Sequence, residues 1–269
     1  MKQLKTADCS PAHIKYLSAL KKKRAFVIIS RIVILVLFIA IWEISAHFEF
    51  IDPFITSSPS RILKTICNLY NDGSLFLHIG VTLFETVVGF LLGTALGIGI
   101  AILLWWSPTL SRILDPYLIV LNALPKIALG PILIVWIGAG ITSIIVMALM
   151  ISVVVTIITM LTGFLNESAD KSLLMRTLGA TKFQTLRLIV LPSSVPTMIS
   201  SLKISVSMSF VGVIVGEYLV SQAGLGYLIV YGGQVFKLDL VMASVVILCV
   251  LAALMYYMVA FVEKRMQSK

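Results

Sequence analysis

Apolar residues gather into six long runs along this chain of 269 residues, with shorter, more polar segments between them. A membrane-spanning helix needs about 20 mostly apolar residues, because the hydrocarbon core is about 30 Å thick and each residue rises about 1.5 Å. The runs are far longer than the roughly 10 alternating residues of a barrel strand. The pattern therefore predicts an all-α polytopic membrane protein with six transmembrane helices. They are expected at about 27–46, 79–105, 116–137, 141–162, 196–220 and 240–262.

The composition excludes the main alternatives to a membrane protein. Hydrophobic residues make up 59% of the chain and charged residues only 12%, whereas soluble domains have about 25% charged residues. So few charges cannot cover a water-facing globule, and so apolar a chain is not disordered. The three cysteines are odd in number and lack motif spacing, which excludes a disulfide scaffold.

Lysines and arginines are distributed unevenly between the two sides of the predicted membrane. If the N-terminus is cytoplasmic, fifteen of them lie inside, in the segments before the first span, after the second, after the fourth and after the sixth. Only Arg61, Lys64 and Lys237 lie outside. This bias predicts that both termini are cytoplasmic. The expected organisation is a basic N-terminal segment 1–26, a transmembrane domain 27–262 and a tail 263–269.

The N-terminal apolar run is interpreted as an uncleaved first span, because it is too long for a signal peptide and lacks a clear cleavage site. Ser10 and Pro11 form a good helix start. We expect a basic helix from there to lie on the anionic inner membrane surface before the first span. The alternative is that these charges only orient the chain.

The second and third predicted spans contain glycines and prolines that affect how the helices pack and bend. Glycines recur every fourth residue at Gly89, Gly93 and Gly97, which predicts a close helix–helix seam. In the third span, Pro125 and Pro131 should kink the helix.

Lys126 lies between those prolines, about mid-span, where an unpaired cation is costly. Three roles remain open for it: an ion pair with Glu85 or Glu217, a position on a solute pathway, or a side chain that reaches the interface.

The fifth span carries a stripe of small polar residues at Ser201, Ser205 and Ser209. Such a stripe is typical of either a pathway wall or a helix contact. Glu217, near the outer end of this span, is a candidate gate residue or an anchor for the loop that follows.

The predicted cytoplasmic loop 166–192 is the most informative segment. We expect Asp170 to cap a short helix over 171–178, with Leu173, Leu174 and Leu178 on its apolar side. Gly179 should end this helix in a left-handed conformation.

A second short helix should follow in the same loop. Thr181 and Gln184 have the spacing of a capping box. The apolar face of this helix is formed by Phe183, Leu186, Ile189 and Val190, and Pro192 is expected to stop it. The two apolar faces either dock into a groove on a partner or pack beneath the chain's own bundle.

The same loop resembles a family signature. Gly179, nine residues and then Ile189-Val190-Leu191-Pro192 match the signature of ABC-importer permeases, and Arg176 to Ala180 look like the same motif. Ser58-Pro59-Ser60, Asn122 to Pro131 and Gly216-Glu217 with Gly224 to Tyr227 also agree in order. Over roughly residues 55–262, the chain resembles the nitrate, sulfonate and taurine branch of that family.

The resemblance implies a type I ABC importer permease fold in the bacterial inner membrane, working by alternating access. It also implies two ATPase subunits that bind ATP and Mg, a second permease copy in a homodimer, an extracytoplasmic solute-binding protein and contact with lipid. The solute would be a small sulfonate, taurine or nitrate-like anion, or alternatively a thiamine-precursor pyrimidine or another small organic solute.

The resemblance further implies that the loop couples the permease to the ATPase. The coupling residues would be Leu173, Leu174, Arg176, Leu178, Gly179, Ala180, Phe183, Ile189, Leu191 and Pro192. One departure stands out, because Leu173, Leu174 and Met175 occupy the place of the family's Glu-Ala-Ala. The candidate pathway residues are Lys126, Ser201, Ser205, Ser209 and Glu217.

The sequence carries no sign of an enzyme. It has no phosphate-binding loop, no cluster of metal ligands and no set of nucleophile and base. We therefore expect no cofactor or metal in this chain and no nucleic-acid partner. Two rival classes are a secondary transporter that works alone and a scaffold or binding subunit of another transporter, but the first should show an internal repeat, and none is apparent.

Overall fold

The computed structural model describes residues 11–166 and 169–267, and all regular structure in these ranges is helical. The chain divides into two compact units, with the boundary between Lys64 and Thr65. The first unit contains α1 (Pro11–His47), α2 (Pro53–Thr56) and the start of α3 (Pro59–Asn71). Within it, Glu43 accepts hydrogen bonds from the backbone N–H and the hydroxyl of Ser60, at 3.0 and 2.8 Å.

Helix α1 corrects one expectation. The basic segment and the first apolar run form one continuous helix of 37 residues, not a surface helix followed by a span. The physical reason is that no glycine or proline lies between Pro11 and His47 to interrupt the helix. The segment Lys22–His47 within it is long and apolar enough to cross a membrane.

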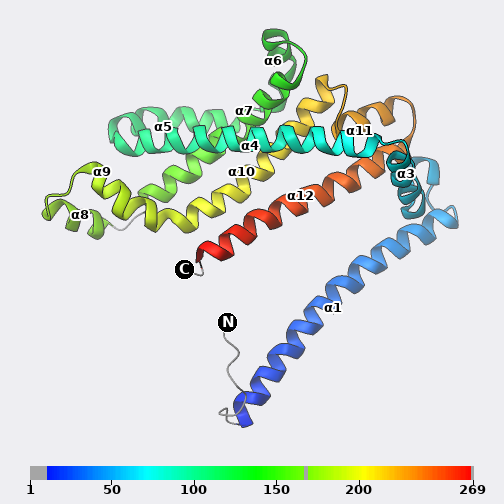
Figure 1. Ribbon diagram of the computed structural model, residues 1–269, viewed down its shortest axis with the longest axis horizontal. Helices are drawn as coiled ribbons and strands as arrows, with labels where there is room; N and C mark the ends of the chain where they lie inside the picture. Colours follow the sequence, from blue (N-terminus) through cyan, green and yellow to red (C-terminus); the bar gives the residue numbers. More distant parts are fainter. Residues whose placement is uncertain (1–10, 167–168, 268–269) are drawn as a thin grey trace. The chain divides into compact units, whose positions relative to one another are not determined.

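The second unit is a bundle of helices (Figure 1). Its elements in chain order are α4 (Ser74–Trp106), α5 (Pro108–Ala123), η2 (Lys126–Leu129), α6 (Gly130–Ile137), α7 (Ile141–Leu165), α8 (Ala169–Thr177), α9 (Lys182–Thr185), η3 (Leu186–Val190), α10 (Leu191–Val220), α11 (Leu225–Gln234) and α12 (Leu238–Gln267). Helix α7 contacts both α4 and α10 along much of its length, and α12 packs against α10 and α11.

Small residues allow α7 to approach its two neighbours closely. The predicted glycine seam is present, since Gly89, Gly93 and Gly97 of α4 all face α7. A Cβ atom at Gly93 would lie 2.5 Å from Oγ of Ser152, and one at Gly212 of α10 would lie 2.5 Å from Cα of Ala148. No side chain fits at these distances, so glycine is required for the contact.

The apolar segments agree with the expected spans except for the third. Five helices are long and apolar enough to cross a membrane, in the part of the chain that the structure describes. The predicted span 116–137 is a bent pair, α5 and η2–α6, with an angle of 83° between its two parts, so the kink expected at Pro125 is confirmed. Leu124 adopts an extended conformation before Pro125, as expected because proline disfavours the helical conformation in the residue before it.

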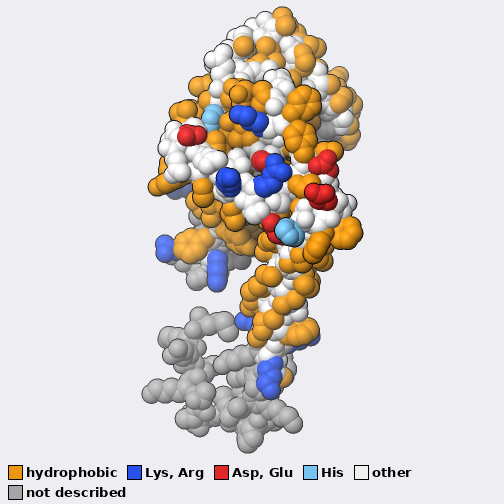
Figure 2. Space-filling view, turned by 90° about the vertical axis from the view of Figure 1, so that its right-hand side faces the viewer, with side chains coloured by type: hydrophobic (Ala, Val, Ile, Leu, Met, Phe, Trp, Pro, Cys, Tyr) orange, Lys and Arg blue, Asp and Glu red, His pale blue; other side chains and the backbone are white. Residues whose placement is uncertain are grey.

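The outer surface of the helices is rich in apolar side chains. Figure 2 shows hydrophobic groups over much of one face, with charged groups confined to limited areas. On α12, for example, the side chain of Tyr257 is 69% exposed. A continuous exposed apolar surface suits lipid better than water.

Candidate functional site

The α8–α9 loop (169–185) has most of the local structure that the sequence predicts. Helix α8 ends at Thr177, and Gly179 follows with a φ of +75°, in the left-handed region. The backbone N–H of Ala180 donates to the carbonyl of Met175 at 2.9 Å, which closes the helix end. Asp170 lies inside α8 and not before it, so its expected position as the cap is wrong.

The predicted capping box is present at the start of α9. The N–H of Gln184 donates to Oγ1 of Thr181 at 3.3 Å, and the N–H of Thr181 donates to Oε1 of Gln184 at 2.7 Å. The expectation that Pro192 stops this helix is wrong. Helix α9 continues through η3 into α10. The π-helical turn of η3 explains this continuity, since its wider turn accommodates a proline ring that would clash in a regular α-helix.

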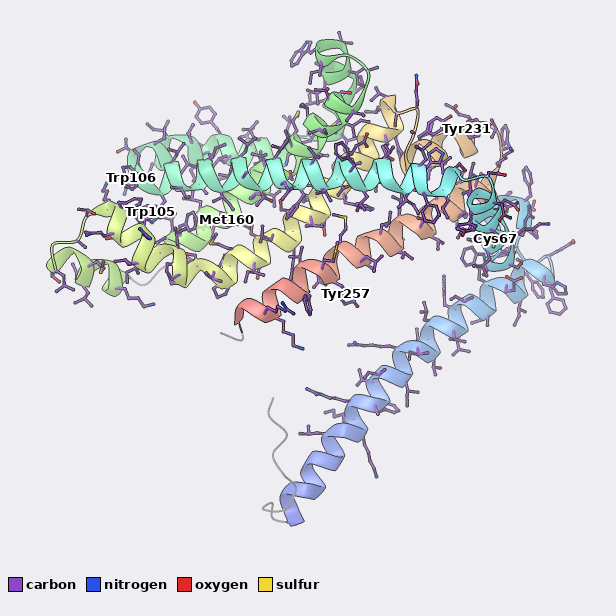
Figure 3. All side chains as sticks on the ribbon, in the orientation of Figure 1. Cys67, Trp105, Trp106, Met160, Tyr231 and Tyr257 are labelled. Atoms are coloured by element: carbon purple, nitrogen blue, oxygen red, sulfur yellow. The ribbon has the colours of Figure 1, made fainter. Side chains whose placement is uncertain are left out.

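Apolar side chains of this segment divide between the bundle and the exterior. Leu186 and Val190 are buried and belong to the same cluster as Met160 of α7, labelled in Figure 3. The outward group has exposed fractions between 58% and 73% and consists of Leu173, Leu174, Leu178 and Phe183. We call these four residues the exposed apolar face. These side chains leave hydrophobic surface uncovered by the described residues on α8, the turn after it and the start of α9.

The other predicted coupling residues lie around this face. Gly179 and Pro192 are exposed, whereas Ala180, Ile189 and Leu191 are partly buried. The backbone of Arg176 lies in α8, but its side chain is outside the part that the structure describes. Nζ of Lys182, at the start of α9, donates a hydrogen bond to the carbonyl of Trp106 at the end of α4, at 3.4 Å.

A buried polar network occupies the opposite end of α10. Glu217 is 1% exposed, and its Oε1 accepts a hydrogen bond from the hydroxyl of Thr82 on α4 at 2.6 Å. Its Oε2 accepts from the backbone N–H of Gly226 at 2.5 Å. Thr82 in turn accepts from the N–H of Leu225 at 2.8 Å, and His78 Nδ1 accepts from the N–H of Gly224 at 3.0 Å.

This geometry makes Glu217 an anchor for the loop between α10 and α11. Gly224 has a φ of +116°, and a Cβ atom on it would lie 2.3 Å from the carboxylate of Glu217. A Cβ atom on Gly226 would also lie within 3.0 Å of that carboxylate. Both glycines are therefore needed for the loop to close over the carboxyl group of Glu217. A role for Glu217 in a solute pathway remains a prediction.

A second carboxyl group lies beside this network without hydrogen bonds of its own. Glu85 of α4 is 1% exposed, and neither of its carboxyl oxygens has a hydrogen-bond partner among the described residues. Its carboxyl group interacts with that of Glu217 through charge and, when either acid is protonated, through a shared proton. A buried acceptor without a donor is unusual, because it loses its hydration without compensation.

The serine stripe of α10 is buried among α4, α7 and α10. Ser205 is hydrogen bonded to Thr94 of α4 at 3.2 Å and to Thr156 of α7 at 3.1 Å. Ser201 pairs with Thr159 of α7 at 2.9 Å, whereas the hydroxyl of Ser209 has no partner in the described part of the chain. In this single chain, the stripe is a helix contact, and a role in lining a pathway remains a prediction.

Lys126 lies away from both glutamates. The Glu217 oxygens are occupied by Thr82 and Gly226, and those of Glu85 have no described partner. Lys126 lines a separate cavity of about 330 Å³, whose other lining residues are apolar side chains of α5, η2 and α7. The contacts of the described residues give no ion pair between Lys126 and either glutamate, and a pathway role for Lys126 remains a prediction.

Sequence reasoning missed two residues that hold the loop together with Glu217. Thr82 donates to Glu217 and accepts from Leu225, and His78 accepts from Gly224. A polar residue in an apolar span is itself a signal, so both were detectable as unusual. Their pairing with residues more than 140 positions away could not be detected from the sequence. Among the described residues, no group of histidines, cysteines or acidic residues is placed to hold a metal.

Comparison with known proteins gives a consistent match. Residues 93–268 fit the family model described as binding-protein-dependent transport system inner membrane component. The chain is 30% identical to a probable ABC transporter permease protein of Haemophilus influenzae, over 84% of this chain and 91% of that protein.

Two further relatives carry more specific descriptions. A formylaminopyrimidine transport permease protein of Halalkalibacterium halodurans is 29% identical, over 76% of this chain and 81% of its own length. A putative aliphatic sulfonates transport permease protein of Bacillus subtilis is 27% identical, over 85% of this chain and 83% of its own.

The fold also matches a solved structure. The structure of an inward-facing methionine ABC transporter contains a chain with a TM-score of 0.61 and 20% sequence identity. The match covers 70% of this chain and 92% of that one. The shared fold is that of type I ABC importer permeases, as the sequence signature implied.

Proposed function

This chain belongs to the family of binding-protein-dependent transport system inner membrane components, and from that premise we propose how it works, with which partners and on which solutes. As a family member, it is a multi-pass permease component of an ABC importer, and ATP hydrolysis belongs to a separate subunit. The family works with ATPase and solute-binding subunits.

The proposed assembly contains two copies of this permease and two ATPase subunits, which bind ATP and Mg. Both termini and the α8–α9 loop face the cytoplasm, where the positive residues of the chain concentrate. The opposite end of α10, with its glutamates, then faces the solute-binding protein outside.

One observation carries the coupling role of the loop. The exposed apolar face, Leu173, Leu174, Leu178 and Phe183, lies on α8, the turn after it and the start of α9, and no described residue covers it. A helix of this kind binds in an apolar groove of a partner. We place the ATPase there, in contact with leucines instead of the glutamate that the family has at position 173.

The continuous helix from α9 to α10 can carry a movement of the loop into the transmembrane domain. Helix α9 continues without a break through η3 into α10, so a displacement of the loop is transmitted directly to the helix that carries Ser201, Ser205 and Glu217. Closure of the ATPases on ATP would then re-pack α10 against α4 and α7 and alternate access to the pathway. ATP shifts this equilibrium only to the extent that it binds one arrangement better than the other.

The proposed solute is a small sulfonate, taurine or nitrate-like anion. The aliphatic sulfonate relative and a half-buried cation at Lys126 support this class. A pyrimidine related to thiamine precursors is the second candidate, supported by the formylaminopyrimidine relative.

The test replaces two leucines of the exposed apolar face. In Leu174→Ala with Leu178→Ala, we expect copurification of the ATPase and solute-stimulated ATP hydrolysis in nanodiscs to fall about tenfold or more, which corresponds to about 1.4 kcal/mol of lost contact. The matched control is Leu254→Ala with Met258→Ala, two exposed apolar residues with the same spacing on α12. A normal ATPase yield and rate in the first variant would contradict the coupling role.

A further inference from the structure

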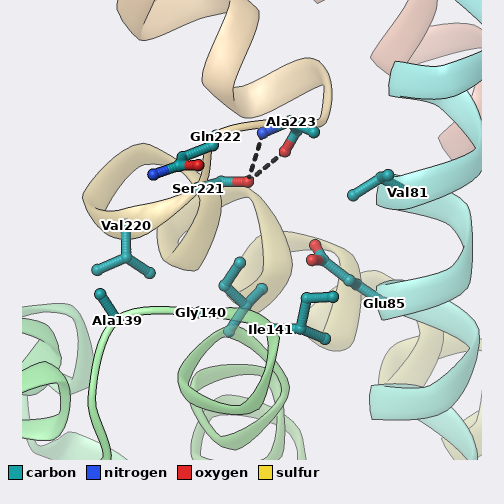
Figure 4. A pocket seen from close by; sticks show the side chains of 10 residues that line it. Val81, Glu85, Ala139, Gly140, Ile141, Val220, Ser221, Gln222 and Ala223 are labelled. Carbon is teal, nitrogen blue, oxygen red and sulfur yellow. Dashed lines mark hydrogen bonds between the residues drawn. The ribbon is translucent and has the colours of Figure 1, made fainter.

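A cavity of about 340 Å³ lies where α10 ends, at the opposite end of the bundle from the α8–α9 loop. It is lined by Val81 and Glu85 of α4, the start of α7 at Gly140 and Ile141, and the loop after α10 (Figure 4). This volume is at the lower end of the range for small-molecule sites, about 300–1,000 Å³. The cavity therefore suits a solute of a few heavy atoms or one end of a larger solute.

The carboxyl group of Glu85 extends into this cavity (Figure 4). It is almost fully buried, and both of its oxygens lack a hydrogen-bond partner among the described residues. Two polar side chains of the neighbouring loop line the cavity, but neither is a hydrogen-bond partner of Glu85. The hydroxyl of Ser221 bonds to the backbone of Ala223, and the amide group of Gln222 points away from Glu85 (Figure 4). An ionisable group at membrane depth is expensive to maintain and marks a functional site.

Charge favours a positive ligand in this cavity. Glu217 adds a second carboxyl group close to Glu85, but its oxygens are already occupied by Thr82 and Gly226. Two carboxyl groups this close repel one another when both are ionised, and a cation beside them stabilises the ionised form. The lining residues include no lysine, arginine or histidine that supplies this charge from the described part of the chain.

Directional bonding favours a nitrogen cation over a metal ion. A metal ion with oxygen ligands takes six or more of them, whereas Glu85 offers two oxygens. The side chains of Ser221 and Gln222 are the other polar ones in the lining, and Val81, Ile141, Ile144 and Val220 form an apolar wall beside them. An ammonium or amidinium group instead donates one or two N–H bonds to a carboxylate. The apolar wall can then hold the attached carbon atoms.

We propose that this cavity is a subsite for a protonated nitrogen of the transported solute, with Glu85 as the acceptor of its N–H groups. This inference rests on the proposed function and narrows the solute. Taurine, with its ammonium group, and protonated aminopyrimidines meet the requirement. Nitrate and simple aliphatic sulfonates do not, because they bring only negative charge to two carboxyl groups.

The site can be tested in the intact complex without knowledge of the solute. A hydrophobic carbodiimide labels carboxyl groups in apolar surroundings, and mass spectrometry of the Glu85 peptide measures the labelling rate. Methylammonium should slow this rate in proportion to its concentration, by about tenfold at ten times its dissociation constant. Tetramethylammonium has the same charge without N–H groups and is the matched control at equal ionic strength, and it should protect little.

Other results would overturn the subsite. They are equal protection by both ammonium ions, no protection by either, protection by sodium as strong as that by methylammonium, and failure of Glu85 to react at all. Glu43, whose carboxylate already accepts hydrogen bonds from Ser60, is the internal reference, and its labelling should not respond to methylammonium.

A transport measurement separates this inference from the proposed function. Taurine and 2-hydroxyethanesulfonate differ only by an ammonium group in place of a hydroxyl group. In the reconstituted complex, taurine should stimulate ATP hydrolysis more than 2-hydroxyethanesulfonate, and Glu85→Gln should remove that preference. If methylammonium protects Glu85 but no ATPase copurifies, the importer function is contradicted and the subsite is supported. If an ATPase copurifies but methylammonium does not protect Glu85, the subsite is contradicted and the importer function is supported.

Discussion

The loops at the two ends of α10 differ in how their backbone groups are hydrogen bonded and in how much apolar surface they expose. Between α10 and α11, buried side chains from α4 and α10 accept the backbone N–H groups of Gly224, Leu225 and Gly226. The α8–α9 loop satisfies its backbone locally, through the Gly179 turn and the capping box of Thr181, but leaves its leucines exposed. Buried side chains of this chain therefore satisfy the backbone of the α10–α11 loop. The α8–α9 loop also has its backbone hydrogen bonds, but it exposes apolar side chains.

This difference predicts opposite consequences for substitutions in the two loops. Changes in the α10–α11 loop network should lower the stability of the chain itself. Changes on the exposed apolar face should leave stability intact and affect assembly, as in the leucine test above.

The largest effect on stability is expected for Glu217→Ala. This change removes the acceptor of two buried donors, Thr82 and Gly226, and each orphaned donor costs about 1–3 kcal/mol. We expect the free energy of unfolding in mixed SDS micelles to fall by about 3 kcal/mol. Faster amide exchange at residues 224–226 should accompany it.

The control for that prediction is Glu43→Ala. Its carboxylate also accepts two hydrogen bonds, but both come from Ser60 at an exposed position. Surface changes of this kind usually alter stability by no more than about 0.5 kcal/mol. Equal losses in the two variants would mean that burial of the Glu217 network contributes nothing to the loop.

A smaller effect on stability is expected within the η3 turn, where one leucine faces the core and another faces outward. Leu186 is 6% exposed and Leu188 is 60% exposed, although they are two residues apart. Leu186→Ala should lower the free energy of unfolding by about 2 kcal/mol, because it leaves a cavity beside Met160. Leu188→Ala should change it by less than about 0.5 kcal/mol. Similar values for both, measured in the same micelles, would contradict the division between inward and outward side chains.

Local patterns predicted much of this fold. The apolar runs, the Gly89 seam, the turn at Gly179 and the capping box at Thr181 each depend on residues close in sequence, and the structure contains all four. The two prolines differ in this respect. Pro125 bends the third span as predicted, whereas Pro192 was expected to stop a helix but follows a π-helical turn and lets the helix continue.

The polar network could be predicted only in part. Glu217 was recognised as a loop anchor or a gate residue, because a carboxylate beside a glycine-rich loop is visible in the sequence. Its bond to Thr82 joins residues 135 positions apart and depends on how α4 meets α10. The unpartnered state of Glu85 is equally a property of the assembled bundle, because it requires knowing which donors do not reach it.

The smallest effects are expected in the serine stripe, where they separate a helix contact from a pathway wall. Ser201 is hydrogen bonded to Thr159 of α7, and such bonds between membrane helices average about 0.6 kcal/mol. Ser201→Ala should cost about that much, and the loss should disappear in a Thr159→Ala background. Ser209→Ala should cost nothing, because its buried hydroxyl has no described partner. If both serine variants instead keep their stability and change only the rate of solute transport, the stripe lines the pathway, and its contact with α7 is incidental.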